Sequence, residues 1–195
     1  ILKGLSEKSL MIMEALDQNR KKIVPYFQPI MRLNNMRIEA YEGLTRIVTP
    51  ERVIPAAEFI ETAESMGAIG KIDYLLMEQT FAKVKEKNYN GLLFLNLSPK
   101  ALVINEFMPT MRGLLKTYGI DPSKMVFEIT ERDTVKNVSL IERFIRDLKL
   151  EGFRFAIDDF GAGYSSFQYI KMFSVDFLKV DGEFIRNLGE KGAVE

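Results

Sequence analysis

The sequence contains no cysteine, no histidine and no tryptophan. Without cysteine, a disulfide, an iron–sulfur cluster, a cysteine nucleophile and a cysteine-ligated zinc site are all excluded. Without histidine, a Ser-His-Asp triad, a histidine-ligated zinc site and a two-histidine iron site are excluded as well. Acid–base chemistry must therefore come from Asp, Glu, Lys or Tyr. Any metal must be held by oxygen ligands, which favours Mg²⁺, Mn²⁺ or Ca²⁺.

The chain also lacks an excess of charge and a long apolar run. Its 27 basic residues balance 27 acidic ones, so we expect no nucleic-acid polymer as a partner and only local phosphate binding. No apolar run approaches the ~18 residues of a membrane-spanning helix, so we expect no membrane insertion. The 195 residues suit one domain, and neither end has a secretory signal or a clear terminating element. We expect a piece of a longer, cytoplasmic protein.

Strand-like and helix-like runs alternate along most of the chain, which predicts an α/β fold with a mainly parallel sheet. The predicted strands are Tyr26–Ile30, Ile38–Thr45, Leu92–Leu97, Met125–Thr130, Phe153–Asp158 and Asp176–Val180. The predicted helices are Ser6–Lys22, Pro55–Met66, Lys71–Lys87, Glu106–Tyr118 and Lys136–Leu150. The last has its apolar residues Ile141, Phe144, Ile145 and Leu148 at helical spacing.

Residues 1–23 are interpreted as an N-terminal connector and residues 24–195 as the main domain. The helical run before the first strand has two readings. It either covers the base of the domain or connects it to an upstream sensor or signalling domain. For the main domain, an open doubly wound sheet and a (β/α)8 barrel compete, and the positions of the polar residues favour the barrel.

Each of the six predicted strands has a polar residue at or near its carboxyl end. These residues are Gln28, Glu42, Arg46, Asn96, Ser98, Glu128, Thr130, Glu131, Asp158, Asp159, Lys179 and Asp181. One acidic residue after a strand is usually a solvated loop residue or a helix cap. Recurrence over six strands is typical of a barrel, in which these ends form the active-site face.

The residue types at these strand ends suit a divalent cation. Glu42, Asn96, Glu128 and Asp158 offer four oxygen donors, and Asp159 could ligate a second ion. Asn96 follows a run of apolar residues, and a buried amide without partners would cost a few kcal/mol, which indicates a functional role. Two neighbouring ions can activate a water and stabilise both oxygens that exchange at phosphorus. Lys179 could steady the developing negative charge, and Arg46 is a fork-shaped phosphate donor.

The ordered motifs resemble those of the EAL domain, the cyclic-di-GMP phosphodiesterase module of bacterial signalling proteins. The matching stretches are Gln28-Pro29-Ile30, Glu42-Gly43-Leu44-Thr45-Arg46, Asn96-Leu97-Ser98, Glu128-Ile129-Thr130-Glu131, Asp158 through Ser166, and Leu178-Lys179-Val180-Asp181. The resemblance runs from about residue 24 to residue 195. It implies a TIM-like (β/α)8 barrel, seen here as about six β/α units. The implied activity is hydrolysis of cyclic-di-GMP to linear pGpG with two ions of Mg²⁺ or Mn²⁺.

The resemblance also implies a role for each matching residue. Glu42, Asn96, Glu128 and Asp158 would bind one ion, and Asp159 and Asp181 would serve the second. Lys179 would lie beside the nucleophilic water, so that Glu42, Asp159 and Lys179 form the catalytic group. Gln28, Leu44 and Arg46 would contact the dinucleotide. Glu131 would anchor the loop from Asp159 to Ser166, whose position couples metal binding to dimerisation in this family, so a homodimer is a possible partner state.

The chain departs from the family pattern at two positions and at its end. Gly43 replaces the alanine of the Glu-Ala-Leu signature, and Ala162 stands where the family usually has threonine. In the family, a seventh and an eighth strand follow, and the seventh carries a catalytic glutamate. We therefore expect the 195 residues alone to show little hydrolysis, and a binding or interaction module without catalysis is the alternative function. A receiver domain fits poorly, because the 20-residue step from Asp159 to Lys179 leaves no room for its extra strand and helix.

Overall fold

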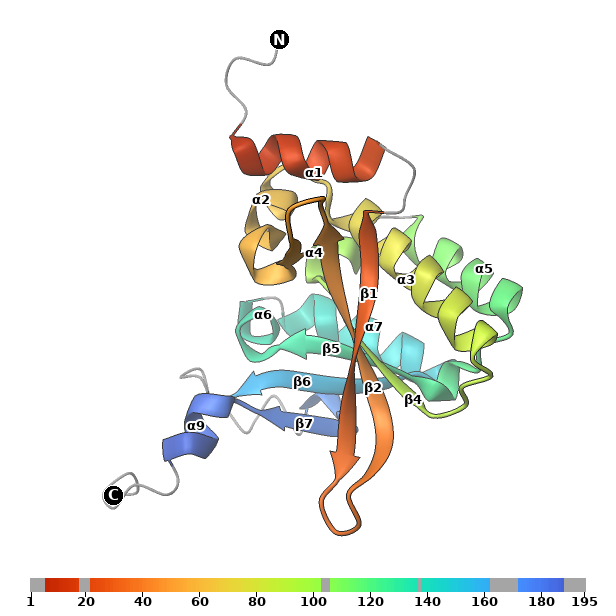
Figure 1. Ribbon diagram of the computed structural model, residues 1–195. Coiled ribbons are helices and arrows are strands. Elements are labelled where there is room, and N and C mark those ends of the chain that lie inside the picture. Colours follow the sequence, from red (N-terminus) through yellow and green to blue (C-terminus); the bar gives the residue numbers. More distant parts are fainter. Residues whose placement is uncertain (1–5, 18–21, 103–105, 137, 162–171, 188–195) are drawn as a thin grey trace. The chain divides into compact units, whose positions relative to one another are not determined.

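The computed structural model describes residues 6–17, 22–102, 106–136, 138–161 and 172–187. The chain divides into two compact units, residues 1–121 and residues 122–195, which are described separately. The fold is α/β: Figure 1 shows both strands and helices in each of the two units. No helix within the described part of the chain is long and apolar enough to cross a membrane.

Unit 1 is a four-stranded sheet with helices packed against it. Its elements are α1 (Glu7–Asp17), β1 (Ile23–Arg32), β2 (Arg37–Val48), β3 (Val53–Pro55), the 3₁₀ turn η1 (Ala56–Glu58), α2 (Ile60–Ser65), α3 (Ile69–Glu86), β4 (Leu92–Asn96), α4 (Pro99–Leu102) and α5 (Phe107–Tyr118). Strand β2 is central: it pairs antiparallel with β1 and β3 and parallel with β4.

The hairpin of β1 and β2 is the longest feature of unit 1 in Figure 1. Its turn forms because the Asn35 side chain accepts a hydrogen bond from the Arg37 backbone and Met36 adopts a left-handed conformation with φ of 53°. Behind the turn, Arg32 and Glu39 form an exposed ion pair across the two strands. The strand–helix alternation predicts a mainly parallel sheet. The pair β1 and β2 departs from this prediction, because a hairpin makes its two strands antiparallel.

The core of unit 1 lies between the hairpin and the helices that flank it. Its buried residues are Ile12, Ala15, Ile23, Ile47, Ile54, Phe59, Ala63, Ile72 and Leu75. Two of them belong to α1, so this helix packs on the sheet of unit 1, as one of the two readings of the N-terminal helical run predicts. Burial of these side chains stabilises the face of the hairpin opposite the one that carries Gln28 and Glu42.

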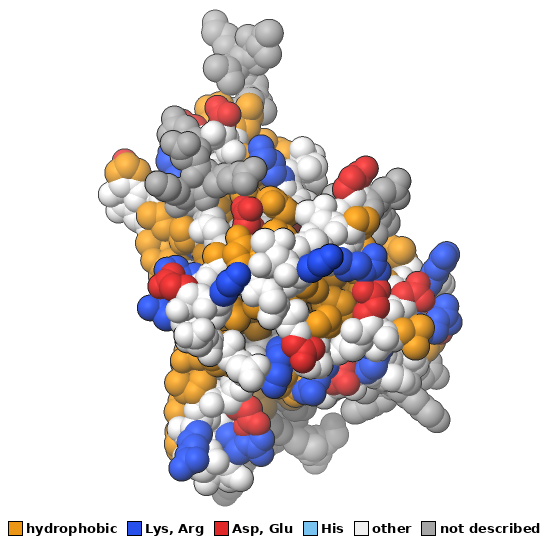
Figure 2. All heavy atoms as spheres, turned by 90° about the vertical axis from the view of Figure 1, so that its right-hand side faces the viewer, with side chains coloured by type: hydrophobic (Ala, Val, Ile, Leu, Met, Phe, Trp, Pro, Cys, Tyr) orange, Lys and Arg blue, Asp and Glu red, His pale blue; other side chains and the backbone are white. Residues whose placement is uncertain are grey.

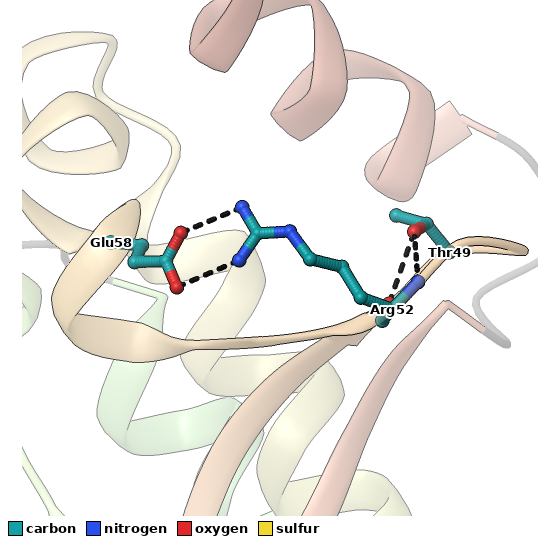
Figure 3. A network of polar contacts seen from close by, with 3 residues as sticks. All are labelled: Thr49, Arg52 and Glu58. Carbon is teal, nitrogen blue, oxygen red and sulfur yellow. Dashed lines mark hydrogen bonds and ion pairs between the residues drawn. The ribbon is translucent and has the colours of Figure 1, made fainter.

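A short strand that the sequence pattern missed, β3, is held by polar contacts that Figure 3 shows. The Arg52 guanidinium donates to both carboxylate oxygens of Glu58 at 2.9 and 2.7 Å. Before it, the Thr49 hydroxyl accepts from the Arg52 backbone N–H and donates to its carbonyl. The guanidinium holds the pKa of Glu58 below its usual value. The predicted helix over Pro55–Met66 is therefore wrong at its start, because Pro55 ends β3 and a 3₁₀ turn follows.

Unit 2 contains three parallel strands and the helices that connect them. Its elements are η2 (Pro122–Lys124), β5 (Met125–Thr130), α6 (Glu131–Lys136), α7 (Val138–Leu150), β6 (Arg154–Phe160), β7 (Phe177–Val180) and α9 (Gly182–Asn187). Strand β6 pairs parallel with both β5 and β7. The apolar side of α7 buries Ile141, Ile145 and Leu148, as its spacing predicts, and Phe155 of β6 packs against the rings of Phe127 and Phe144.

Most predicted elements are present, with corrections at their ends. Strand β5 has the predicted bounds, whereas β1 and β2 extend beyond theirs to form the hairpin. Helix α6 directly follows β5, and two residues separate α4 from the end of β4. Neither helix was predicted, because short helices have too few turns for an apolar period. On the face of the molecule in Figure 2, basic and acidic side chains are interspersed, in agreement with the balanced net charge.

Candidate functional site

One face of the unit 1 hairpin carries the predicted substrate and metal residues. The antiparallel register places Gln28 opposite Glu42, Tyr26 opposite Leu44 and Val24 opposite Arg46. Directly opposed residues in an antiparallel pair point to the same side of the sheet, and so do residues two apart on one strand. Gln28, Glu42, Leu44 and Arg46 therefore share one face.

Strand β4 adds the next predicted ligand to this face. The Asn96 amide nitrogen donates to Glu42 Oε1 at 3.3 Å, so the two predicted metal ligands of unit 1 are neighbours. Asn96 is exposed at the end of β4, after three buried residues. The sequence argument that its amide is buried is therefore wrong, although the residue lies where that argument placed it, at the strand end.

Arg46 is held over an aromatic ring that the sequence analysis missed. Its Nη1 donates to the Thr45 carbonyl at 2.9 Å, and its guanidinium carbon lies 5.9 Å from the centre of the Tyr26 ring. This distance is within the range of a cation–π contact. The sequence signal for Tyr26 was its position two residues before Gln28, which places both side chains on the same face of β1.

Behind the end of β4 lie two further carboxylic acids. The Ser98 hydroxyl donates to Glu64 Oε1 at 3.3 Å, which links the segment after Asn96 to α2. Asp73 of α3 is only 8% exposed. Burial, and secondly the charge of Glu64, raises the pKa of Asp73 to about 8, so this carboxyl is largely protonated at neutral pH.

In unit 2, one lysine joins the predicted acids of two strands. Lys179 of β7 lies with Nζ 2.7 Å from Glu128 Oε1 and 3.2 Å from Asp158 Oδ1. Glu128 is only 1% exposed, Asp158 is half-buried, and the Lys179 side chain is 26% exposed. The three residues come from three adjacent parallel strands, and the ammonium group compensates the charge of carboxylates that burial would otherwise disfavour.

The remaining predicted acids of unit 2 have local partners. The Asp159 backbone N–H donates to Asp158 Oδ1 at 3.0 Å, and Asp159 has a left-handed φ of 54°. Such a conformation is uncommon outside glycine, and the Asp159 side chain is exposed. Asp181 Oδ1 accepts the Glu183 backbone N–H at 2.8 Å, so it caps α9, while its own N–H donates to the Phe160 carbonyl.

Glu131 contacts the segment that follows β6. Its Oε2 accepts the Gly161 backbone N–H at 3.2 Å, the kind of bond that a loop-anchoring role requires. Glu131 lies in the first turn of α6, which the Thr130 hydroxyl caps. This hydroxyl donates to Asp133 Oδ2 at 2.7 Å and accepts the Asp133 N–H at 3.2 Å. The rest of the predicted loop, from Ala162 to Ser166, lies outside the described residues, so the anchoring role stays a prediction.

The donor set fits a hard divalent cation in its chemistry. Unit 1 brings together a carboxylate and an amide, and unit 2 brings together two carboxylates, all from strand ends and all offering oxygen ligands. In unit 2 an ammonium group already lies between Glu128 and Asp158, which shows that this position favours positive charge. Glu128 and Asp158 can therefore hold a metal cation, and Lys179 beside them can donate a hydrogen bond to an anionic substrate.

Comparison with known proteins identifies the family. The model of the EAL domain family matches residues 10–194. The chain is 30% identical over 182 residues to the cyclic di-GMP phosphodiesterase PdeB of Shewanella oneidensis, an alignment that covers 91% of this chain and 21% of PdeB. The chain spans about a fifth to a quarter of the length of the first curated relatives that it matches.

Solved structures share the fold. The PaMucR phosphodiesterase in complex with c-di-GMP superposes with a TM-score of 0.85 at 25% identity, covering 95% of this chain and 76% of that chain. The manganese/cy-diGMP complex of Klebsiella pneumoniae BlrP1 has a TM-score of 0.74 at 25% identity, with coverage of 86% and 42%. The fold is thus that of EAL domains, which are TIM-barrel-like, as the sequence motifs predict. Since the family match extends over nearly the whole sequence, this chain belongs to the EAL domain family.

Proposed function

We propose that this chain hydrolyses the cyclic dinucleotide second messenger cyclic-di-GMP to linear pGpG, with Mg²⁺ or Mn²⁺, in bacterial signalling. The observation that carries the proposal is the position of Lys179 between Glu128 and Asp158, at the carboxyl ends of parallel strands. Relatives named as cyclic di-GMP phosphodiesterases, and neighbours solved with cyclic-di-GMP, support the same substrate.

In this proposal Glu42, Asn96, Glu128 and Asp158 together hold one divalent cation, and Asp159 and Asp181 serve a second. The neighbour solved with manganese and the all-oxygen donor set support this assignment. When bound, such ions lower the pKa of a water ligand and stabilise developing charge at phosphorus. The protein's part is to fix the donors, and the contacts of Glu42 with Asn96 and of Lys179 with two acids limit how far these side chains can move.

Lys179 has a second part in the proposed reaction. Its ammonium group carries three N–H donors and lies within 3.2 Å of the carboxylates of Glu128 and Asp158. We assign to Lys179 a hydrogen bond, made when substrate is bound, to the attacking water or to the phosphate oxygen on which charge accumulates. A fixed donor at such a position stabilises the transition state more than the ground state.

Gln28, Leu44 and Arg46 contact the dinucleotide in this proposal. They share one face of the hairpin with Glu42, so a phosphodiester beside the Glu42 carboxylate would be within reach of all three. Arg46 offers a planar guanidinium for bidentate contact with a phosphate, and Gln28 offers an exposed amide with two donors and an acceptor. Leu44 adds apolar contact with a base or ribose.

The test is incubation of the protein with cyclic-di-GMP and Mn²⁺, followed by chromatographic separation of cyclic and linear products. We expect linear pGpG from a protein that also carries the two further strands of the family, and little from the 195 residues alone. Glu42→Gln in the longer protein should give none, since it keeps the shape of the side chain but removes its charge. Glu39→Gln, on the same strand but exposed and paired with Arg32, is the matched control and should leave turnover unchanged.

Titration with cyclic-di-GMP in Ca²⁺ separates binding from hydrolysis. Binding without turnover in Mn²⁺ by the protein that carries the two further strands would contradict hydrolysis and support the alternative of a cyclic-di-GMP receptor. Neither binding nor turnover would contradict the substrate assignment. Arg46→Ala should weaken binding of the dinucleotide about tenfold or more, because a charge-assisted bond to phosphate is lost, while leaving metal affinity unchanged. A homodimer and an upstream sensor domain stay predictions.

A further inference from the structure

We propose that Tyr26 is a substrate-positioning residue, whose ring stacks against a guanine base of the cyclic dinucleotide beside the phosphate that Arg46 contacts. This inference rests on the proposed function, because it assigns one more contact to the same substrate. It adds an aromatic residue to the proposed substrate contacts Gln28, Leu44 and Arg46, which supply an amide, an aliphatic side chain and a guanidinium.

The register of the hairpin places Tyr26 among the proposed substrate residues. It lies opposite Leu44 and two residues before Gln28, so its side chain projects from the same face as those two. The neighbouring ring, that of Phe27, projects from the opposite face, where it packs edge-on against Tyr41. Alternation along β1 therefore assigns only one of these two adjacent aromatic residues to the substrate side.

Exposure and contact geometry point to a ligand-facing ring. The Tyr26 side chain is 46% exposed, although it lies within the ten-residue strand β1. The Arg46 guanidinium carbon lies 5.9 Å from the centre of its ring. A phosphate bound by Arg46 has its base one ribose away, and the Tyr26 ring is the aromatic surface next to that guanidinium.

Stacking on an aromatic ring is a common way for proteins to bind a nucleobase. Tyr26 is suited to it because the β-sheet backbone fixes the position of the ring and only two side-chain torsions need ordering on binding. The contact with Arg46 also restrains the guanidinium, so that less of its conformational freedom is lost when phosphate binds.

The test measures the dissociation constant of cyclic-di-GMP in Ca²⁺ for four proteins. We expect Tyr26→Leu to weaken binding about tenfold, within the range measured for loss of one base–aromatic stack. Tyr26→Phe keeps the ring and should bind nearly as well as the unaltered protein. Phe27→Leu makes the same kind of change at the adjacent, 36% exposed residue on the opposite face, and should have no effect.

A double-substitution cycle separates stacking from an effect through Arg46. If Tyr26 contacts the base, Tyr26→Leu should weaken binding about as much in an Arg46→Ala background as in the unaltered protein. If the loss disappears in that background, the ring acts only as a support for the guanidinium and the stacking proposal is overturned. A cyclic-di-GMP analogue carrying 2-aminopurine gives an independent readout, since its fluorescence should be quenched by Tyr26 and recover in Tyr26→Leu.

The outcomes also separate this inference from the proposed function. Turnover and binding that are unaffected by Tyr26→Leu would overturn the stacking alone and leave the hydrolase assignment in place. Failure of the unaltered protein to bind cyclic-di-GMP would contradict the proposed function and the stacking together. Because Tyr26 is half exposed, its replacement should not unfold the protein, and an unchanged urea unfolding midpoint verifies this.

Discussion

The two clusters of predicted site residues differ in how their charges are compensated. In unit 1, Glu42 and Asn96 are joined by one hydrogen bond of 3.3 Å, and both are at least partly exposed to solvent. In unit 2, Glu128 is buried and paired with Lys179 at 2.7 Å. Exposed groups exchange partners at little cost, whereas a buried ion pair is needed for stability once it is formed. The unit 1 cluster is therefore suited to ligand contact, and the unit 2 cluster contributes to folding as well as to the proposed chemistry.

A buried acid also exists in unit 1, and the comparison with Glu128 shows a second way to bury a carboxyl. Asp73 keeps its proton, since burial raises its pKa to about 8. Glu128 instead has an ammonium group beside it. A protonated acid is neutral without a partner, while a carboxylate beside a cation retains its charge for binding a metal. Only the second arrangement is useful at a catalytic centre that needs ionised ligands.

The largest effect should come from removing the cation of unit 2. Lys179→Met leaves Glu128 and Asp158 as buried or half-buried carboxylates without their ammonium partner. We expect the free energy of unfolding at pH 7 to fall by about 3 kcal/mol, near the lower end for breaking a buried pair because the lysine is partly exposed. Urea unfolding measures this loss. Adding Mn²⁺ should recover part of it, since a cation held by the same acids replaces the missing charge.

Lys83→Met is the matched control for this substitution. It breaks an exposed pair with Glu86, 2.7 Å apart, in which both side chains are more than half exposed. Its effect on the free energy of unfolding should stay within about 0.5 kcal/mol, with or without Mn²⁺. An equal loss for Lys83→Met and Lys179→Met would contradict the distinction drawn between the two clusters.

The second effect is a pH dependence that Asp73 gives to unit 1. Its pKa is about 8 in the folded state, against 3.8 for an ordinary aspartate. Between these two values the folded state holds a proton that the unfolded state has released. The stabilising contribution is therefore complete below about pH 4 and is lost as pH rises toward 8, at about 1.4 kcal/mol per pH unit.

Asp73→Asn tests this dependence because an amide does not titrate. Urea unfolding between pH 5 and pH 7 should show a smaller decline in stability for Asp73→Asn than for the unaltered protein. Other groups contribute equally to both proteins and cancel in the difference. Asp147→Asn, at an exposed position of α7, should leave the decline unchanged. Parallel pH profiles for Asp73→Asn and the unaltered protein would show that Asp73 is ionised in the folded state.

The sequence predicted the strand–helix order and the positions of most candidate site residues on the strands, because periodicity and strand-end polarity are local signals. For this reason the sequence predicted the buried apolar side of α7 and the bounds of β5. Strand β3 was missed because its three residues are too few for alternation, and it is held by contacts such as that of Arg52 with Glu58. Such contacts depend on distances between residues that composition and spacing do not give.

The site itself shows the same limit. Motif positions identified Lys179 and Glu131, but their partners Asp158 and Gly161 follow from how the parallel strands align in register. The contact between Tyr26 and Arg46 requires knowing that β1 and β2 are antiparallel and which residues are opposed. A shift of one residue in this register would have moved Tyr26 to the other face of the sheet.

The smallest expected effect concerns Gly43, the residue that replaces alanine in the family signature. A Cβ at this position would lie 2.6 Å from Cδ2 of Leu95, which is 1% exposed in β4 next to Asn96. Leu95 thus fills the space that an alanine methyl would need, and restoring the alanine overpacks the sheet behind the unit 1 cluster. We expect Gly43→Ala to lower the free energy of unfolding by about 1 kcal/mol, since the obstructing atom is the flexible end of a side chain.

A double-substitution cycle with Leu95→Val decides whether this packing is the cause. Valine lacks the atom that obstructs the methyl group, so Gly43→Ala should cost almost nothing in the Leu95→Val background. The same cost in both backgrounds would show that Leu95 does not limit the position. Affinity for Mn²⁺ should stay unchanged throughout, because the Glu42 carboxylate lies on the opposite face of β2 from the added methyl group. The exposed cluster of unit 1 would then tolerate a packing change behind it, whereas the buried cluster of unit 2 does not tolerate the loss of Lys179.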